Sequence, residues 1–143
     1  MKPLPSSLIA GAVLAGFVAC ASAQPVHPPP PGPPATICNA GICTIQITVN
    51  NCGASGGIKV DPGDLGMPVA SGPAVIHWKI VTPGFVFATD GIRFDPPSPQ
   101  FRPLPSPQPN EIRMRNDKSA TGAFYYFVDV LNCIPVDPFI RNF

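Results

Sequence analysis

The sequence is poor in charged residues and has no long apolar run. Charged side chains make up 12% of its 143 residues, and nine basic against eight acidic residues leave a formal net charge of +1. Nucleic-acid binding is dominated by Lys and Arg on phosphates, so this balance argues against a nucleic-acid partner. No stretch reaches the roughly 18 apolar residues that a membrane-spanning helix needs. We therefore predict a mature protein without a transmembrane segment.

Side chains that carry catalysis are also scarce. Of the two histidines, His27 lies in a proline-rich stretch, which leaves His77 as the one candidate for a general base. Nucleophilic hydrolysis needs a folded base beside its nucleophile, and no G-x-S-x-G motif accompanies His77. We predict a protein that is not an enzyme and carries no cofactor, with His77 exposed on a strand. Four aspartates match no calcium-loop spacing and are better explained as turn residues: Asp61, Asp64, Asp90 and Asp95.

The first residues form the three-part pattern of a secretory signal. Lys2 precedes an apolar run from Leu8 to Val18, and Ala21-Ser22-Ala23 then supplies small residues for cleavage before Gln24. At about eleven residues the run is too short to cross a bilayer as a helix. The pattern predicts a secreted or periplasmic protein.

A lipid anchor is the alternative to free export. Phe17-Val18-Ala19-Cys20 resembles a bacterial lipobox, in which the cysteine is acylated and becomes the first mature residue. Phe17 fits poorly at a position where such boxes usually carry Leu. Lipidation of Cys20 is therefore the less favoured interpretation, and it would turn the following proline-rich segment into a tether.

The 22 prolines fall mostly in two clusters, from Pro25 to Pro34 and from Pro96 to Pro109, without a repeating period. Collagen-like structure is excluded, and two extended segments are implied. The folded part is then roughly 105 residues, enough for a single core. We divide the chain into a signal peptide (1–23), a proline-rich flexible leader (24–36) and one domain (37–143) with a proline-rich loop at 95–110.

The cysteines predict two disulfides. Removal of the signal leaves an even number in an oxidising compartment, namely Cys38, Cys43, Cys52 and Cys133. The segments 44–52 and 126–133 both end in Asn-Cys after an alternating run. Laid parallel and in register, they bring Cys52 beside Cys133 and leave Cys38 to pair with Cys43. Four thiolates could instead hold zinc, but only Cys38 and Cys43 come near the usual close spacing of zinc ligands.

Alternation of apolar and polar residues is the dominant period, and helical spacing is absent. In 75–81, for example, Trp78 is predicted to face a core. Seven prolines between Asp95 and Asn110 rule out a central strand there and predict a surface excursion. We predict an all-β, two-sheet Greek-key sandwich. Its expected strands number about seven: 44–50, 75–81, 85–87, 92–94 after a turn at 89–91, 111–116, 123–131 and 137–141.

The Trp78 strand, followed late in the chain by Gly122-Ala123-Phe124-Tyr125-Tyr126-Phe127, resembles the cupredoxin-like fold. Residues 43–143 also look like small secreted bacterial proteins that share a Trp-containing strand and a closing D-P-x-I-x-N segment. Immunoglobulin-like sandwiches share much of this pattern, so both topologies stay open. The cupredoxin resemblance implies a copper site made of a thiolate and two imidazoles. No histidine or methionine follows Cys133, so we expect that site to be absent.

A binding or structural role remains, with an unknown protein or envelope component as partner. The proline-rich loop could present Phe101, Arg102 and Leu104 in a polyproline II conformation, which loses little entropy on binding. The sequence leaves the ligand and the oligomeric state open. Two alternatives stand beside this prediction, a metalloprotein that uses His77, Met67 or Met114 and a lipid-anchored envelope component. Lys79, His77, Arg113 and Arg115 could also form a cationic stripe on one sheet if their strands are neighbours.

Overall fold

The computed structural model describes residues 32–143; the predicted signal peptide, the lipobox cysteine and most of the leader lie outside the described residues. Ten strands and a single 3-10 turn, η1 (Val69–Ser71), form within this range. The strands are β1 (Thr36–Ile37), β2 (Gly41–Val49), β3 (Ile58–Asp61), β4 (Asp64–Met67), β5 (Ala74–Ile80), β6 (Phe87–Phe94), β7 (Phe101–Leu104), β8 (Glu111–Asn116), β9 (Gly122–Val130) and β10 (Phe139–Asn142).

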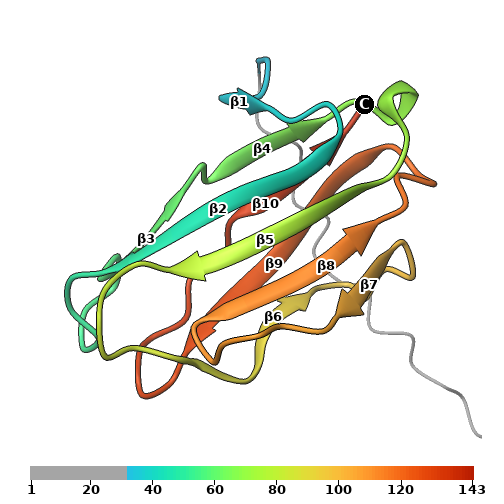
Figure 1. Cartoon of the computed structure of the whole chain (residues 1–143). Coiled ribbons are helices and arrows are strands. Elements are labelled where there is room, and N and C mark those ends of the chain that lie inside the picture. Colours follow the sequence, from blue (N-terminus) through green and yellow to red (C-terminus); the bar gives the residue numbers. More distant parts are fainter. Residues whose placement is uncertain (1–31) are drawn as a thin grey trace, which may run out of the picture.

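The strands form two mixed sheets of five that pack face to face, so the predicted all-β sandwich is confirmed (Figure 1). One sheet has the order β3-β2-β5-β8-β7 and the other the order β1-β4-β10-β9-β6. Parallel pairing joins β2 to β5 in the first sheet and β4 to both β1 and β10 in the second. Strands β3 and β4 are separated by only two residues but lie in opposite sheets, which closes one side of the sandwich.

Strict alternation builds the core, because successive side chains of a strand point to opposite faces. In β5, Ala74, Ile76, Trp78 and Ile80 are buried, and the residues between them are half-buried. Aromatic rings then join the two sheets. Trp78 meets Tyr126 of the opposite sheet edge to face, with ring centroids 5.5 Å apart. Burial raises the pKa of Tyr126 well above its ordinary value.

The predicted turn at Thr89-Asp90-Gly91 is wrong, because 87–94 forms one strand, β6. Its pairing with β9 shifts register between Phe87 and Ile92, so the chain bulges there without reversing. Gly91 permits the bulge, since a Cβ at that position would lie 2.6 Å from the Cβ of Phe87. Turn-forming residues therefore mark a distortion within the strand.

Sequence patterns missed the short strands. β1, β3, β4 and β7 contain two to four residues each, too few for an alternating run to stand out. β7 lies inside the predicted surface excursion, at the edge of its sheet. An edge strand tolerates Pro103, although proline has no backbone N–H to donate to a neighbouring strand. Within residues 32–143, no helix is long and apolar enough to span a bilayer.

Candidate interaction surface

Four loops gather at one end of the sandwich, at the lower left of Figure 1. The parallel strands β2 and β5 both end there, and β8 and β6 begin there. β9 also ends there, since Phe87 pairs with Val130. The loops are 50–57, 81–86, 105–110 and 131–136, and we call the surface that they form the uncharged end, because none of these residues is Asp, Glu, Lys, Arg or His.

Backbone hydrogen bonds fasten these loops to one another. Leu131 N donates to Val86 O at 3.0 Å, and Ile134 N donates to Cys52 O at 3.0 Å. Phe87 N donates to Pro109 O at 3.1 Å, which ties the start of β6 to the loop before β8. Buried backbone groups normally need hydrogen-bond partners. Because the loops supply these partners to one another, they are held in a defined arrangement.

The disulfide between Cys52 and Cys133 joins two of the loops, as predicted from the sequence. β2 and β9 run to the same end of the sandwich, as the parallel arrangement requires, but they belong to opposite sheets and do not pair with each other. The disulfide therefore ties one sheet to the other across the uncharged end. The second predicted disulfide, Cys38–Cys43, is also formed, at the opposite end.

Apolar side chains stand out from the uncharged end. Leu131 is 51% exposed, Ile134 48% and Val81 41%. A hollow of about 510 Å³ lies beside Val81, between the 81–86 and 108–110 segments, with Lys79, Phe85 and Pro109 among its lining residues. Loops that combine exposed apolar side chains with fixed backbone are typical of contact surfaces.

Glycine is required in one of these loops by close backbone approach. A Cβ at Gly57 would lie 1.5 Å from Asn51 O, which no side chain can occupy. Asn50 N and Asn51 N both donate to Gly57 O, at 2.8 and 3.2 Å, so the loop folds tightly back on itself. The 50–57 loop consequently presents a compact, neutral surface next to Cys52.

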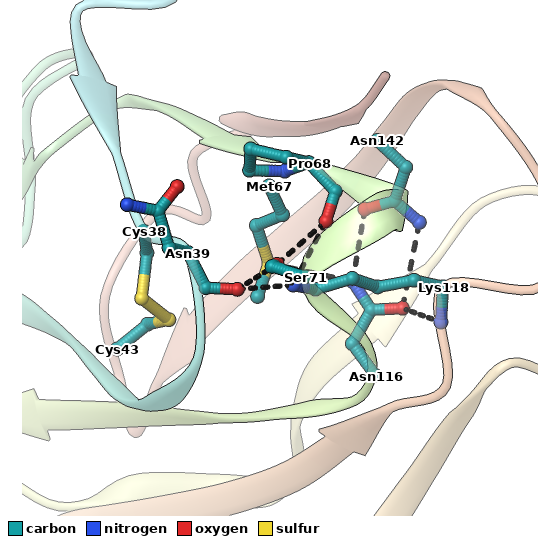
Figure 2. Close-up of a disulfide and its surroundings, with 9 residues drawn as sticks. All are labelled: Cys38, Asn39, Cys43, Met67, Pro68, Ser71, Asn116, Lys118 and Asn142. Carbon is teal, nitrogen blue, oxygen red and sulfur yellow. Dashed lines mark hydrogen bonds between the residues drawn. A yellow bond between two sulfur atoms is a disulfide. The ribbon is translucent and has the colours of Figure 1, made fainter.

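The opposite end of the sandwich is built on a buried polar network (Figure 2). Asn116 and Asn142, both nearly inaccessible, are joined by a 2.9 Å bond from Asn116 Nδ2 to Asn142 Oδ1. Asn142 Nδ2 also donates to Gln100 Oε1 at 3.0 Å. Asn116 Oδ1 accepts from Lys118 N at 2.9 Å. We call these residues, with Lys118, the polar network.

Lys118 joins its own segment to two others at this end, the loop at Asn39 and the turn at 68–71. Its ammonium donates to Asn39 O at 2.7 Å, to Pro68 O at 3.1 Å and to Ser71 Oγ at 2.6 Å. Burial lowers the pKa of Lys118, and the three oxygens solvate the charge in place of water. Asn39 lies within the small loop that Cys38–Cys43 closes, so this disulfide and Lys118 hold the same segment (Figure 2). The N–H groups of the Lys118 ammonium therefore all donate to other residues of the fold.

The outer face of the β3-β2-β5-β8-β7 sheet carries the predicted cationic residues, and β5 and β8 are neighbours. Glu111 interrupts the stripe, with Oε1 3.1 Å from Lys79 Nζ. The hydrogen bond from Lys79 lowers the pKa of Glu111. His77 is not exposed as predicted, since its side chain is only 14% accessible and its Nε2 lies 3.3 Å from Glu111 Oε2. β5 lies between β2 and β8, so side chains of these neighbouring strands cover His77.

The predicted contact residues of the proline-rich loop separate. Phe101 points into the core and stacks on Phe94, with ring centroids 3.8 Å apart. Arg102 and Leu104 stay exposed, and Arg102 Nη2 forms a 2.6 Å ion pair with Asp117. Phe101 therefore anchors β7 and offers a partner no surface. Alternation along β7 explains the split, and a proline-rich composition hid that alternation in the sequence.

The alternative metal ligands are not brought together. His77 lies on the outer face of β5, whereas Met114 on β8 pairs with the inward Ile76 and Met67 is fully buried. Met67 Sδ accepts a 3.3 Å bond from Asn116 Nδ2. Among residues 32–143, no group of three His, Cys, Asp or Glu side chains is placed to hold a metal ion. All four cysteines of this range are in disulfides.

No protein-family model matches the sequence, and no curated protein matches it either. The case for a function therefore depends on the geometry of the molecule itself.

Proposed function

We propose that this chain is an exported, non-catalytic binding module whose contact surface is the uncharged end. The observation that carries the proposal is the exposure of Val81, Leu131 and Ile134 on loops whose backbone is already fixed. Ordering loops on binding costs free energy, and loops that are ordered beforehand avoid that cost. The partner that suits this surface is a protein with a neutral, apolar contact patch, because none of the four loops carries a charged residue.

The two disulfides support export. Disulfides persist in oxidising compartments and are rare in the cytosol, and Cys38–Cys43 and Cys52–Cys133 both form. The signal-like pattern before Gln24 gives the same direction from the sequence. Mass spectrometry of the mature N-terminus separates the two export routes. Free export predicts Gln24 as first residue, and an acylated Cys20 would show a lipid-anchored envelope component.

The cupredoxin-like topology is also a proposal. It is supported by the parallel pairing of β2 with β5 and of β4 with β10, and by the passage of the chain from one sheet to the other between β3 and β4. In that fold the loop before the last strand supplies the thiolate of the copper site. Here the corresponding cysteine, Cys133, is bonded to Cys52 and is not available as a thiolate ligand. This supports a binding role over electron transfer.

Site-specific photocrosslinking tests the proposal. A benzophenone amino acid is placed at Leu131 in the exported protein, and at Ile42 as a control, because Ile42 is an exposed apolar residue (67%) on β2, away from the uncharged end. The proposal predicts one dominant adduct from Leu131, identified by mass spectrometry as an exported protein, and none at Ile42. Equal adducts from Leu131 and Ile42 would contradict the proposal. So would the absence of an adduct both from Leu131 and from the same amino acid placed at Ile134.

A deletion of the proline-rich loop would not be informative. Removing 96–109 would take away β7 with its core residue Phe101, and also Gln100, which belongs to the polar network. The protein would lose stability for reasons unrelated to binding. Point substitutions of exposed residues avoid this problem.

A further inference from the structure

We propose that the proline-rich leader of this chain docks on the outer face of its own β1-β4-β10-β9-β6 sheet, with residues 25–31 as a polyproline II segment across an aromatic surface. We call this surface the aromatic face; it consists of Phe139 on β10 and of Tyr125 and Phe127 on β9. It is a surface other than the uncharged end, so the inference does not depend on the proposed function. Residues 25–31 precede the described part of the chain, whose contacts support the docking.

The last residues of the leader are seated on this sheet. Gly32 O accepts a 2.6 Å hydrogen bond from Arg141 Nη1 on β10. Arg141 is itself held by Asp64, with Nε 2.9 Å from Oδ1. Pro34 packs over Gly66 of β4, where a Cβ would lie 2.3 Å from Pro34 Cγ, so the glycine admits the leader. The leader therefore reaches the domain through two contacts with the sheet on which we place the rest of it.

The aromatic face is unusual for the outer side of a sheet, where polar side chains are the norm. Its residues alternate with buried ones along β9 and β10, so they point away from the core. Tyr125 lies opposite Phe139, with ring centroids 5.6 Å apart. Arg141 lies 5.6 Å from the ring centroid of Phe139, and Arg93 of β6 lies 4.9 Å from that of Phe127. Clustered rings on an outer face mark a contact surface.

The leader has the composition that such a surface binds. Five of the seven residues 25–31 are proline, and proline-rich chains adopt the polyproline II helix before they bind. Aromatic-lined surfaces recognise such segments, and the stiff chain loses little entropy on docking. A polyproline II chain makes no internal hydrogen bonds, so its carbonyls need donors. Arg141 supplies one to Gly32, and Arg93 places further donors on the same face.

Reach and attachment favour the leader of the same chain over another proline-rich partner. At a rise of about 3.1 Å per residue, residues 25–31 span about 22 Å. The way from β10 across β9 to β6 is two strand spacings, about 10 Å, so the segment can cross the aromatic face. A hollow of about 310 Å³ beside Gly32, with Ala123 of β9 in its lining, lies at the start of this path. Covalent attachment gives the leader an effective concentration on the order of millimolar, at which weak contacts suffice.

Tyrosine nitration of the mature exported protein, purified with its disulfides intact, tests the docking. The chain contains two tyrosines, and Tyr126 is 1% exposed, so tetranitromethane reports on Tyr125. Replacing the four prolines 28–31 by serine should raise the nitration rate of Tyr125 several-fold, because the segment then leaves its ring uncovered. These positions precede every strand, so the substitutions spare the fold. The matched control, Pro105→Ser with Pro107→Ser, changes exposed prolines between β7 and β8 and should leave the rate unchanged.

Proton NMR observes the contact itself. We expect nuclear Overhauser effects between the proline rings of 28–31 and the rings of Tyr125 and Phe139, and we expect the serine variant to lose them. In a mixture of isotope-labelled and unlabelled protein, these effects should arise within one chain.

Three results would overturn the inference. The first is a nitration rate that the leader substitutions leave unchanged, without Overhauser effects at the aromatic face. The second is a rise in the control variant as large as that in the leader variant. The third is Overhauser effects between chains in the labelled mixture, which would assign the leader to the face of a second copy. The role of the uncharged end is judged separately, by the crosslinking experiment at Leu131.

Discussion

The two ends of the sandwich are held together in opposite ways, although each contains one disulfide. At the uncharged end, backbone groups of four loops bond to one another, and apolar side chains such as Leu131 point outward. At the other end, buried side chains form the polar network, and the ammonium of Lys118 bonds two further segments, at Asn39 and at 68–71. Exposed apolar side chains also occur there, since Ile42 and Phe143 are exposed. The ends therefore differ in what holds them together, which is backbone bonding between loops at one and buried polar side chains at the other.

The two disulfides should differ most in their effect on stability. Cys52–Cys133 spans 81 positions, whereas Cys38–Cys43 spans five. In the chain-entropy model, closing the longer loop stabilises the fold by about 4.5 kcal/mol and the shorter one by about 2 kcal/mol. We therefore expect Cys52→Ala with Cys133→Ala to lower the free energy of unfolding more than Cys38→Ala with Cys43→Ala.

Urea unfolding of the two double variants measures the difference. Cys43 is buried, so replacing it also costs packing energy. This cost raises the destabilisation of the Cys38–Cys43 double variant and therefore works against the predicted difference. Equal destabilisation by both pairs would show that the uncharged end does not depend on its link between the two sheets.

The polar network should depend on the charge of Lys118. Lys118→Met keeps the length of the side chain but removes the ammonium, so the oxygens of Asn39 and Pro68 keep only their bonds from Ser71. Hydrogen bonds to charged groups contribute about 1.5–3 kcal/mol, and we expect a loss of about 1–3 kcal/mol. Lys59→Met, at an exposed lysine of β3, is the matched control and should change stability by less than about 0.5 kcal/mol. Similar values for both variants would argue against a structural role of the network.

Acid should loosen the polar-network end before the uncharged end. Hydrogen bonds from Arg102 and Arg115 lower the pKa of Asp117, which follows β8 at that end. Because the native pKa lies below that of the unfolded chain, the unfolded state binds more protons as the pH falls. The stabilisation is complete above the ordinary value of 3.8 and is lost as the pH falls below it.

Hydrogen exchange at pH 7 and at pH 3 tests this order. Amides near Asp117 and Lys118 should gain exchange on acidification more than amides of 131–136, where no group titrates. Asp117→Asn should exchange faster at pH 7 and respond less to acid. An equal response at both ends would remove the electrostatic part of the contrast.

The sequence predicted what depends on periodicity and on cysteine number. The inward position of Trp78 and both disulfides follow from patterns visible along the chain, and the structure confirms them. The polar network could not be predicted, because Gln100, Asn116 and Asn142 are far apart in sequence and look like ordinary surface residues. Their burial results from the packing of the two sheets on each other, which brings the ends of β8 and β10 together. A lysine after an Asn-Asp turn gives no signal of burial.

The uncharged end had a weak signal in the sequence that the strand pattern concealed. Four separate loops lack charge, but only the parallel order of β2 and β5 shows that they meet. Attention to the proline-rich loop led instead to Phe101, which alternation turns into the core. Composition identified a surface segment, and pairing decided which of its side chains are accessible.

The smallest expected effect is on the stability of the monomer when charge is added to the uncharged end. Leu131 is half exposed, so Leu131→Asp removes few core contacts, and we expect less than about 0.5 kcal/mol of change in urea unfolding at low concentration. Ile42→Asp should behave alike there. If the uncharged end serves contact and the polar network serves stability, urea unfolding will not separate these variants, and only capture of a partner at Leu131 will. A large loss from Leu131→Asp in dilute solution would show that the exposed apolar side chains hold the fold, and the contrast between the two ends would disappear.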